Sequence, residues 1–496
     1  MKVQQPDPVL IVGRNVNMVA GRTLPDGDPY LQRQNEPSGA ASTRNPLHLL
    51  FGSNDYRTVD IAQSEGPLPG VPEGAAAGDA WLGVFKSYNG GESWKTSLLP
   101  GYPQDLTAEG ARSPLFGIGA ASDPTVRAGA NGMFYYSGIA FDRVEHGRSV
   151  IFVARFIDNN LTESGDPDSI KYLDTTLIDE GTSGQFADKP WIAVDMPRYG
   201  GETVPINAPN TGVQNVARHN VYIVYSIFLG SSGGGGPSKI MFARSTDCGR
   251  TWERPIKLSE SQHLNQGTTI GISPLDGRII LTWRRYASTN ETHALMACIS
   301  DDFGRTFTKP AEIVSINPFD QFTGAGKFRT TAFPALAVDH NGIAYVAWSQ
   351  RGLGPHGEAR IVIEASKDGV RWSGQVPVDN HPAGGHQIMP SLTFAGGRLM
   401  MTWYDTRKSL GYVDQNGDYH HTDEITDPGP TGKRHTLDVW VAQAFPSNPG
   451  LSPPSSPSFT DSTQVSRYLY QAKTQEPEGW LLDEDDNPVH MSGKPA

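Results

Sequence analysis

A short residue pattern occurs four times in this chain, and it restricts the folds that the chain can adopt. The pattern is Ser, any residue, Asp or Asn, any residue, Gly, any residue, Ser or Thr, and then an aromatic residue. Its copies are Ser87–Trp94, Ser245–Trp252, Ser300–Phe307 and a copy one residue shorter, Ser366–Trp372. Asp and Asn side chains bond to the amides of their own turn, and glycine supplies the positive φ of a tight reversal. Each copy therefore predicts a hairpin turn that is structural rather than catalytic.

The segments before these copies are apolar and typical of strands. They are Ala80–Lys86, Lys239–Arg244, Ala294–Ile299 and Arg360–Ala365. A repeated turn behind repeated strands resembles the Asp-box repeat of the sialidase superfamily, and the resemblance covers about residues 30–445. In the shortest copy, Val370 stands where the other copies carry glycine.

The chain divides into six similar units. Their polar openings are centred on Pro37, Pro124, Pro190, Gly267, Pro334 and Pro390, which lie 56 to 87 residues apart. Repeats of this length with four strands each are typical of propellers. The sequence therefore predicts an all-β fold, a six-bladed β-propeller of four-stranded antiparallel blades.

The predicted propeller spans residues 35–445. Residues 1–34 form an N-terminal segment, in which Pro8–Gly13 is the candidate for an outer strand that closes the last blade. Residues 446–496 form a Pro/Ser-rich linker and a C-terminal tail. One further strand is expected over Thr463–Ala472.

Composition excludes several classes of partner. The net charge of −12 argues against a nucleic-acid surface, and no apolar run is long enough for a membrane span. Cys248 and Cys298 do not make a disulfide framework. Met1–Pro8 lacks the apolar core of a signal peptide, so either the protein stays inside the cell or a leader has been removed, and the sequence does not decide between the two.

No cofactor is expected, and no metal. Asp414–Asp418 has the oxygen spacing that begins a calcium loop, but the later bidentate glutamate is missing. His420 and His421 with Asp423 and Glu424 are adjacent loop residues, and such side chains rarely converge on one ion. Both segments are interpreted as ordinary loops.

Propeller geometry predicts where a binding site lies. The start of the first strand and the end of the second share one face of a blade, and the repeat turns lie on the opposite face. The polar residues at these positions are Arg33, Asn35, Glu36, Asn54, Asp55, Tyr56, Arg57, Asp123, Asp142, Arg143, Asp188, Lys189, Gln266, Arg284, Arg285, Arg329, Arg351, Gln387, Tyr404, Asp405 and Arg407. Arginines hold carboxylates with two parallel hydrogen bonds, and a carboxylic acid protonates a leaving oxygen. This ring predicts a polar site suited to an acidic sugar.

The family resemblance implies individual roles. Sialidases hold the substrate carboxylate with three arginines, use a tyrosine paired with a glutamate as nucleophile, and use an aspartate as acid/base. By resemblance, Asp55 is the acid/base, Tyr404 the nucleophile and Glu36 its partner. The residues expected to bind the substrate are Arg57, Arg329, Arg407, Arg285 and Gln387. The chain departs from the family because no Arg-Ile-Pro occurs near its N-terminus.

The function that the resemblance implies is a glycoside hydrolase of exo-sialidase type, which releases a terminal acidic sugar from glycans. The expected partner is then a glycan. Two alternatives remain open: a non-catalytic propeller that binds glycans or a protein, and a polysaccharide lyase built on a similar propeller. The sequence specifies no oligomeric state.

Overall fold

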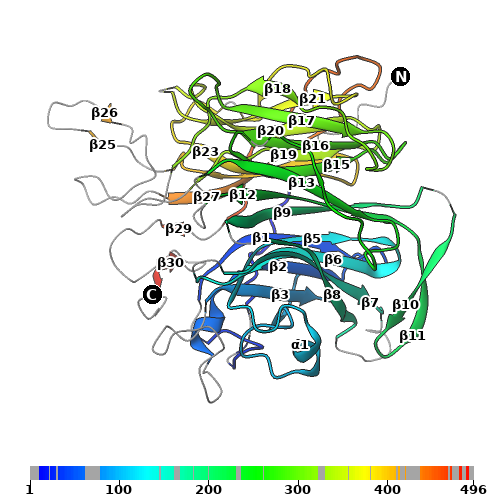
Figure 1. The fold of residues 1–496 in the computed structure, drawn as a ribbon. Helices are drawn as coiled ribbons and strands as arrows, with labels where there is room; N and C mark the ends of the chain where they lie inside the picture. The colour runs from blue at the N-terminus through cyan, green and yellow to red at the C-terminus, as the bar shows by residue number, and fades with distance from the viewer. Residues whose placement is uncertain are drawn as a thin grey trace, which may run out of the picture.

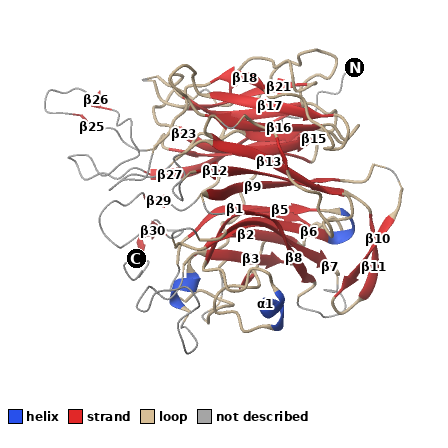
Figure 2. Cartoon of the chain, in the orientation of Figure 1, coloured by secondary structure: helices blue, strands red, loops and turns tan. Residues whose placement is uncertain are grey.

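Six antiparallel sheets make up most of the molecule, and the strands of each sheet follow one another outward in chain order. The computed structural model describes residues 10–19, 21, 23–29, 32–61, 79–144, 147–160, 168–181, 184–198, 200–230, 236–260, 262–321, 330–355, 357–379, 381–408, 412–413, 419–420, 436–466, 470–471, 480–482 and 488–490. Strands dominate the ribbon (Figure 2), and the described residues include the short helices η1 (Arg57–Asp60), α1 (Ala108–Arg112) and η2 (Ala130–Gly132). The predicted six-bladed propeller of four-stranded antiparallel blades is confirmed.

The strands of the first three blades, from the innermost outward, are as follows. Blade one contains β1 (Gln34–Ala41), β2 (Leu49–Asp55), β3 (Trp81–Ser87) and β4 (Lys95–Leu98), and blade two contains β5 (Ala120–Ala128), β6 (Met133–Phe141), β7 (Ser149–Asp158) and β8 (Ile170–Gly181). Blade three contains β9 (Gln185–Asp195), β12 (Asn220–Leu229), β13 (Ser238–Ser245) and β14 (Ile256–Lys257), with the hairpin β10 (Thr203–Ala208) and β11 (Gly212–Ala217) inserted after β9.

The other three blades follow the same scheme. Blade four contains β15 (Asn265–Ile272), β16 (Ile279–Arg285), β17 (Ala294–Ser300) and β18 (Ala311–Ser315), and blade five contains β19 (Ala335–Val338), β20 (Ala344–Gln350), β21 (Arg360–Ser366) and β22 (Val376–Pro377). Blade six contains β23 (Gln387–Ala395), β24 (Arg398–Asp405), β27 (Thr436–Ala444) and β28 (Thr463–Gln464), and β29 (Tyr470–Gln471) also pairs with β27. The described residues also form two small hairpins, β25 (Tyr412–Val413) with β26 (Tyr419–His420) and β30 (Trp480–Leu482) with β31 (Pro488–His490).

The first strands of successive blades touch one another. Contacts join β1 to β5, β5 to β9, β9 to β15, β15 to β19, and β19 to β23, and β1, β5 and β9 lie together in the middle of Figure 1. The faces of the sheets pack against one another through buried apolar residues. The first strands therefore form the innermost layer of the propeller.

The repeat turns close the third strands, as predicted. In the second copy, Gly249 N donates to Ser245 Oγ at 2.9 Å and Thr251 N donates to Asp247 Oδ1 at 2.9 Å. In the short copy, Gly369 has a φ of 74° and its N donates to Ser366 Oγ at 2.8 Å. The shorter turn thus keeps its glycine one position earlier, at Gly369 rather than at Val370.

Strand register places the repeat turns at the far end of each blade from the predicted site. In blade one, Ser87 at the start of a repeat turn pairs with Leu49, whereas Asp55 at the other end of β2 pairs with Gln34. In blade six, Asp405 likewise pairs with Gln387. The predicted separation of structural turns from the polar face is therefore confirmed.

The closure of the ring differs from the prediction. The outer strand of blade six is β28, which pairs Gln464 with Trp440 of β27, and residues 10–13 of the proposed Pro8–Gly13 strand carry no strand. The outer edge of blade six is therefore formed by residues after 445, and the propeller extends beyond its predicted limit at residue 445. The N-terminal segment instead bridges blades, because Asn15 Nδ2 donates to Val465 O at 3.0 Å and Arg57 Nη1 donates to Pro25 O at 2.9 Å.

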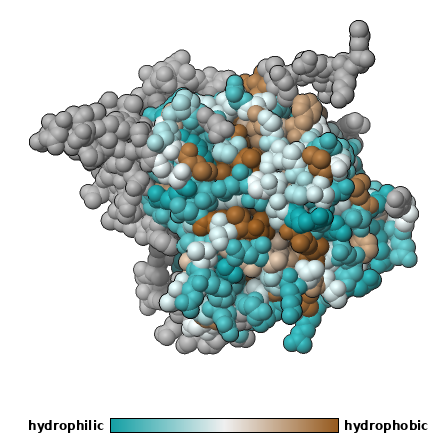
Figure 3. Space-filling view, turned by 90° about the horizontal axis from the view of Figure 1, so that it is seen from above, coloured by the Kyte–Doolittle hydropathy of each residue, from teal (hydrophilic) through white to brown (hydrophobic). Residues whose placement is uncertain are grey.

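Hydrophilic residues cover much of the face shown in Figure 3, with apolar residues in patches between them. In the part of the chain that the structure describes, the helices are too short and too polar to cross a bilayer.

Candidate functional site

The innermost strands of five blades share one local irregularity. Each has a break in its pairing with the second strand, and a residue in the left-handed region lies inside that break. These residues are Glu36 (φ 53°), Asp123 (φ 60°), Lys189 (φ 51°), Gly267 (φ 73°) and Met389 (φ 51°). A left-handed backbone costs about 1–2 kcal/mol for a residue with a side chain. Strained backbone of this kind clusters at functional sites, so these bulges mark a candidate site.

Three of the bulges bring charged side chains together. Lys189 Nζ lies 2.5 Å from Glu36 Oε2 and 3.9 Å from Asp123 Oδ1. These residues come from blades three, one and two, and they are connected by the stacking of β1, β5 and β9. The bulge re-aims each side chain, since it inserts an extra residue into the strand. An undistorted strand would alternate its side chains between two faces.

Two further polar residues extend this group into blade four. Gln266 Nε2 donates to Asp188 Oδ2 at 2.7 Å, and Asp188 directly precedes Lys189. We call Glu36, Asp123, Asp188, Lys189 and Gln266 the axial cluster. Glu36 is 33 % exposed and Asp123 is 12 % exposed, so the cluster opens to solvent on the Glu36 side.

The electrostatics of the axial cluster raise the pKa of two of its carboxyl groups. Burial raises the pKa of Glu36, and Asp123 adds to this rise while Lys189 opposes it. Burial also raises the pKa of Asp123, with Asp188 acting in the same direction. Burial alone would lower the pKa of Lys189, but the Asp123 and Glu36 carboxylates outweigh it and raise that pKa. The cluster thus combines a stable ammonium group with carboxyl groups that hold protons above their usual range.

The predicted residues Asp55 and Arg57 bind each other. Arg57 Nη2 lies 2.5 Å from Asp55 Oδ2, Arg57 Nε lies 3.0 Å from both carboxylate oxygens, and both side chains are fully buried. The short spacing allows this pair, because Arg57 N also donates to Asp55 Oδ1 at 3.0 Å in a tight turn. The roles of acid/base for Asp55 and of carboxylate binding for Arg57 stay predictions, and the burial of both residues disfavours them.

The predicted residues Arg407 and Gln387 meet at Asp379 in blade six. Arg407 Nη2 lies 2.5 Å from Asp379 Oδ2 and 2.6 Å from Asp405 Oδ2, and Gln387 Nε2 lies 3.4 Å from Asp379 Oδ2. This repeats the Asp-x-Arg arrangement of blade one. Here too the guanidinium binds carboxylates of the protein itself.

The other predicted residues lie apart from this group. Tyr404 packs against the apolar cluster that includes Phe319 and Ile388, while its predicted partner Glu36 pairs with Lys189. Arg285 Nη2 lies 3.0 Å from Glu312 Oε2. Arg329 lies outside the described residues, and so does the calcium-like run 414–418.

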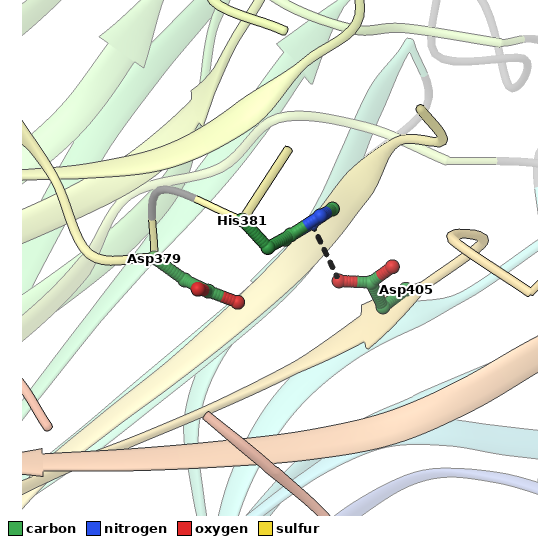
Figure 4. Close-up of side chains that lie close together, drawn as sticks. All are labelled: Asp379, His381 and Asp405. Carbon is green, nitrogen blue, oxygen red and sulfur yellow. Dashed lines mark ion pairs between the residues drawn. The ribbon is translucent and has the colours of Figure 1, made fainter. Parts of the chain in front are cut away.

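Asp379, His381 and Asp405 offer ligand atoms that all lie within 4.8 Å of one another (Figure 4). His381 Nε2 lies 3.8 Å from Asp405 Oδ2, and burial followed by the charge of Arg407 lowers the pKa of His381. The donor set resembles a metal site, but Arg407 already binds both carboxylates, and its positive charge opposes a cation there. The group is better described as an ion-pair network.

Sequence reasoning placed Asp123, Asp188, Lys189 and Gln266 on the polar face but gave them no role. Asp123 and Lys189 share one recognisable signal, because each is a charged residue directly before the proline of a unit opening. Asp379 and His381 were missed, because they lie in the loop before β23 and not at a strand end.

Comparisons with known proteins identify similar folds only. No family model and no curated protein matches the chain. An α-L-arabinofuranosidase from Fusarium graminearum, solved with an iminosugar inhibitor, matches with a TM-score of 0.42 and 14 % identity over 84 % of this chain and 94 % of that one. A Penicillium chrysogenum α-L-arabinanase with arabinobiose matches with a TM-score of 0.40 and 13 % identity over 76 % and 90 %. A Trypanosoma rangeli sialidase matches with a TM-score of 0.40 and 12 % identity over 78 % and 53 %.

Proposed function

We propose that this protein is a glycoside hydrolase and that the axial cluster is its active site. The observation that supports this most is the meeting of carboxyl groups from blades one, two and three around the ammonium of Lys189. Hydrolysis of a glycosidic bond requires one carboxylic acid that protonates the leaving oxygen and a second carboxylate that acts as nucleophile or base. Both kinds of group are present here.

Glu36 is the proton donor in this proposal. Its pKa is raised by burial, and it is the more exposed of the two carboxyl groups that Lys189 contacts. Asp188 is the second carboxylate, and its Oδ2 is held by a hydrogen bond from the Gln266 amide. Lys189 holds Glu36 in place, and Asp123 helps to keep it protonated. Glu36 thus acts as the general acid, and Asp188 acts as the nucleophile or base.

The exo-sialidase expectation is one form of this proposal. It requires arginines that hold a substrate carboxylate, and Arg57 and Arg407 bind carboxylates of the protein. Terminal neutral sugars are therefore as suitable for the axial cluster as acidic ones. An assay decides whether the substrate carries a neutral or an acidic terminal sugar.

The test is hydrolysis of a panel of 4-methylumbelliferyl glycosides that includes an α-sialoside, an α-L-arabinofuranoside and common pyranosides. For a glycoside that the wild type cleaves, Glu36→Gln is expected to lose about 10²- to 10⁴-fold in kcat/KM. Glu92→Gln is the matched control, because Glu92 is exposed in a repeat turn on the opposite face. Cleavage that survives Glu36→Gln contradicts the assignment, and no cleavage of any glycoside between pH 4 and pH 8 favours a non-catalytic binding propeller.

A further inference from the structure

Arg127 is a guanidinium without a carboxylate on the innermost layer of the propeller. It lies on β5, where its Nη1 donates to Val126 O at 2.7 Å and, at the longer distance of 3.5 Å, to Ser38 Oγ of β1. Its Cζ lies 4.8 Å from the ring centre of Trp191 on β9. Among the described residues, no carboxylate pairs with Arg127, and burial alone accounts for a pKa lowered to about 10.

Buried arginines elsewhere in the described structure have carboxylates or several backbone carbonyl groups bound to their N–H groups. Arg57 pairs with Asp55, and Arg284 Nη2 lies 2.5 Å from Asp320 Oδ2. Arg360 donates to three backbone carbonyl groups, at 2.6 to 3.1 Å. A guanidinium has five N–H donors, and Arg127 uses only Nη1 within the described protein. A half-buried charge without a counter-ion is costly, so an external anion would lower the free energy of this region.

The position of Arg127 separates it from the axial cluster. Ser38 follows Glu36 by two residues, and Arg127 follows Asp123 by four. At about 3.3 Å per residue, these offsets correspond to roughly 7–13 Å along the innermost strands. The guanidinium is therefore a separate feature of the same layer, farther from the face on which the carboxyl groups gather.

We propose that Arg127 is the centre of an oxyanion-binding site formed by β1, β5 and β9. Its free N–H groups match the two oxygens of a sulfate, phosphate or carboxylate group. Trp191 supports the guanidinium plane through its ring face. Ser38 Oγ accepts a hydrogen bond from Val126 N at 3.0 Å, which leaves its hydroxyl hydrogen to donate to the anion.

The test is anion binding by the full chain, measured by isothermal titration and by thermal unfolding at constant ionic strength with chloride as the balancing salt. Sulfate, phosphate and glucuronate are the probes. We expect saturable binding of at least one of them and a rise in Tm of about 2 °C or more at 100-fold excess over Kd. Arg127→Met is expected to lose both effects. Arg148→Gln, which removes an exposed arginine paired with Glu180, is expected to keep them.

The outcomes identify the kind of anion that binds, and they also show when the proposal fails. Tighter binding of sulfate or phosphate identifies a free anion as the ligand, and tighter binding of glucuronate identifies a carboxylate carried by a sugar. If Arg127→Met does not fold, Arg127→Lys keeps the charge without the planar fork and is expected to bind about tenfold more weakly. Binding that is equal in wild type and the folded Arg127 variant, or absent for all three probes, overturns the proposal. These readouts do not require hydrolysis, so they are independent of the axial cluster's function.

Discussion

Replacement of Lys189 by methionine removes the single positive charge of the axial cluster and keeps most of the side-chain volume. Glu36 and Asp123 then lose the only ammonium group that either contacts in the described structure. Because an ammonium group favours the ionised form of a neighbouring carboxyl group, its loss is expected to raise the pKa of both carboxyl groups further.

The magnitude follows from the distances. Two unit charges about 4 Å apart interact by about 4 kcal/mol at an effective dielectric constant of 20, and Lys189 Nζ lies 3.9 Å from Asp123 Oδ1. Glu36 Oε2 is nearer, at 2.5 Å, but its side chain is 33 % exposed and more strongly screened. Halving the interaction for solvent screening leaves about 2 kcal/mol for each carboxyl group, and the loss of this interaction raises both pKa values further.

The assay is the free energy of unfolding as a function of pH. A carboxyl group with a raised pKa in the folded state contributes stability that is complete below its ordinary value of 4.5 and is lost as pH rises through the raised pKa. Lys189→Met is therefore expected to lose more stability than the wild type as pH rises from about 5 to 8. The exposed Lys309→Met is the control and should follow the wild type. Parallel profiles for Lys189→Met and wild type refute the account of the cluster.

Three further predictions concern stability. Asp55→Asn leaves Arg57 buried without its counter-ion and is expected to cost about 3–5 kcal/mol in chemical denaturation; a loss under 1 kcal/mol contradicts the structural assignment of that pair. Hydrogen bonds from Thr306 lower the pKa of Asp302 to about 2, so Asp302→Ala should be less stable than wild type at pH 7 and converge with it as pH falls through 3.8 towards 2; a constant difference across this range contradicts the hydrogen-bond account. Met389→Gly relieves a left-handed φ of 51° and is expected to stabilise the protein by up to about 1 kcal/mol in thermal unfolding, whereas a loss shows that the side chain outweighs the strain.

The fold was predictable because its signals are local. The Ser, Asp and Gly residues of each repeat turn bond within eight consecutive residues, as the contacts of Asp247 with Ser245 and Thr251 show. A strand was expected over Thr463–Ala472, where β28 and β29 lie, but its place at the outer edge of blade six was not predictable in this way. Its pairing joins Gln464 to Trp440 across a stretch with no repeat turn, and nothing in the local pattern identifies which terminus reaches that edge.

The candidate site was predictable only as a face of the propeller. Asp55 and Arg57 are close in sequence, and their spacing suits a pair that binds itself rather than a substrate. Lys189 and Glu36 are 153 residues apart, and their contact depends on two bulges and on the stacking of three blades. This contact depends on tertiary structure. The sequence therefore shows which charged residues lie on the polar face but not which of them pair with one another.

The most direct test of the central claim is a crystal structure of Glu36→Gln with a glycoside that the wild type cleaves. We expect a sugar ring in contact with Lys189 and Asp188, with its glycosidic oxygen next to the substituted side chain at position 36. A sugar bound instead against Arg407 and Asp379 in blade six would contradict it.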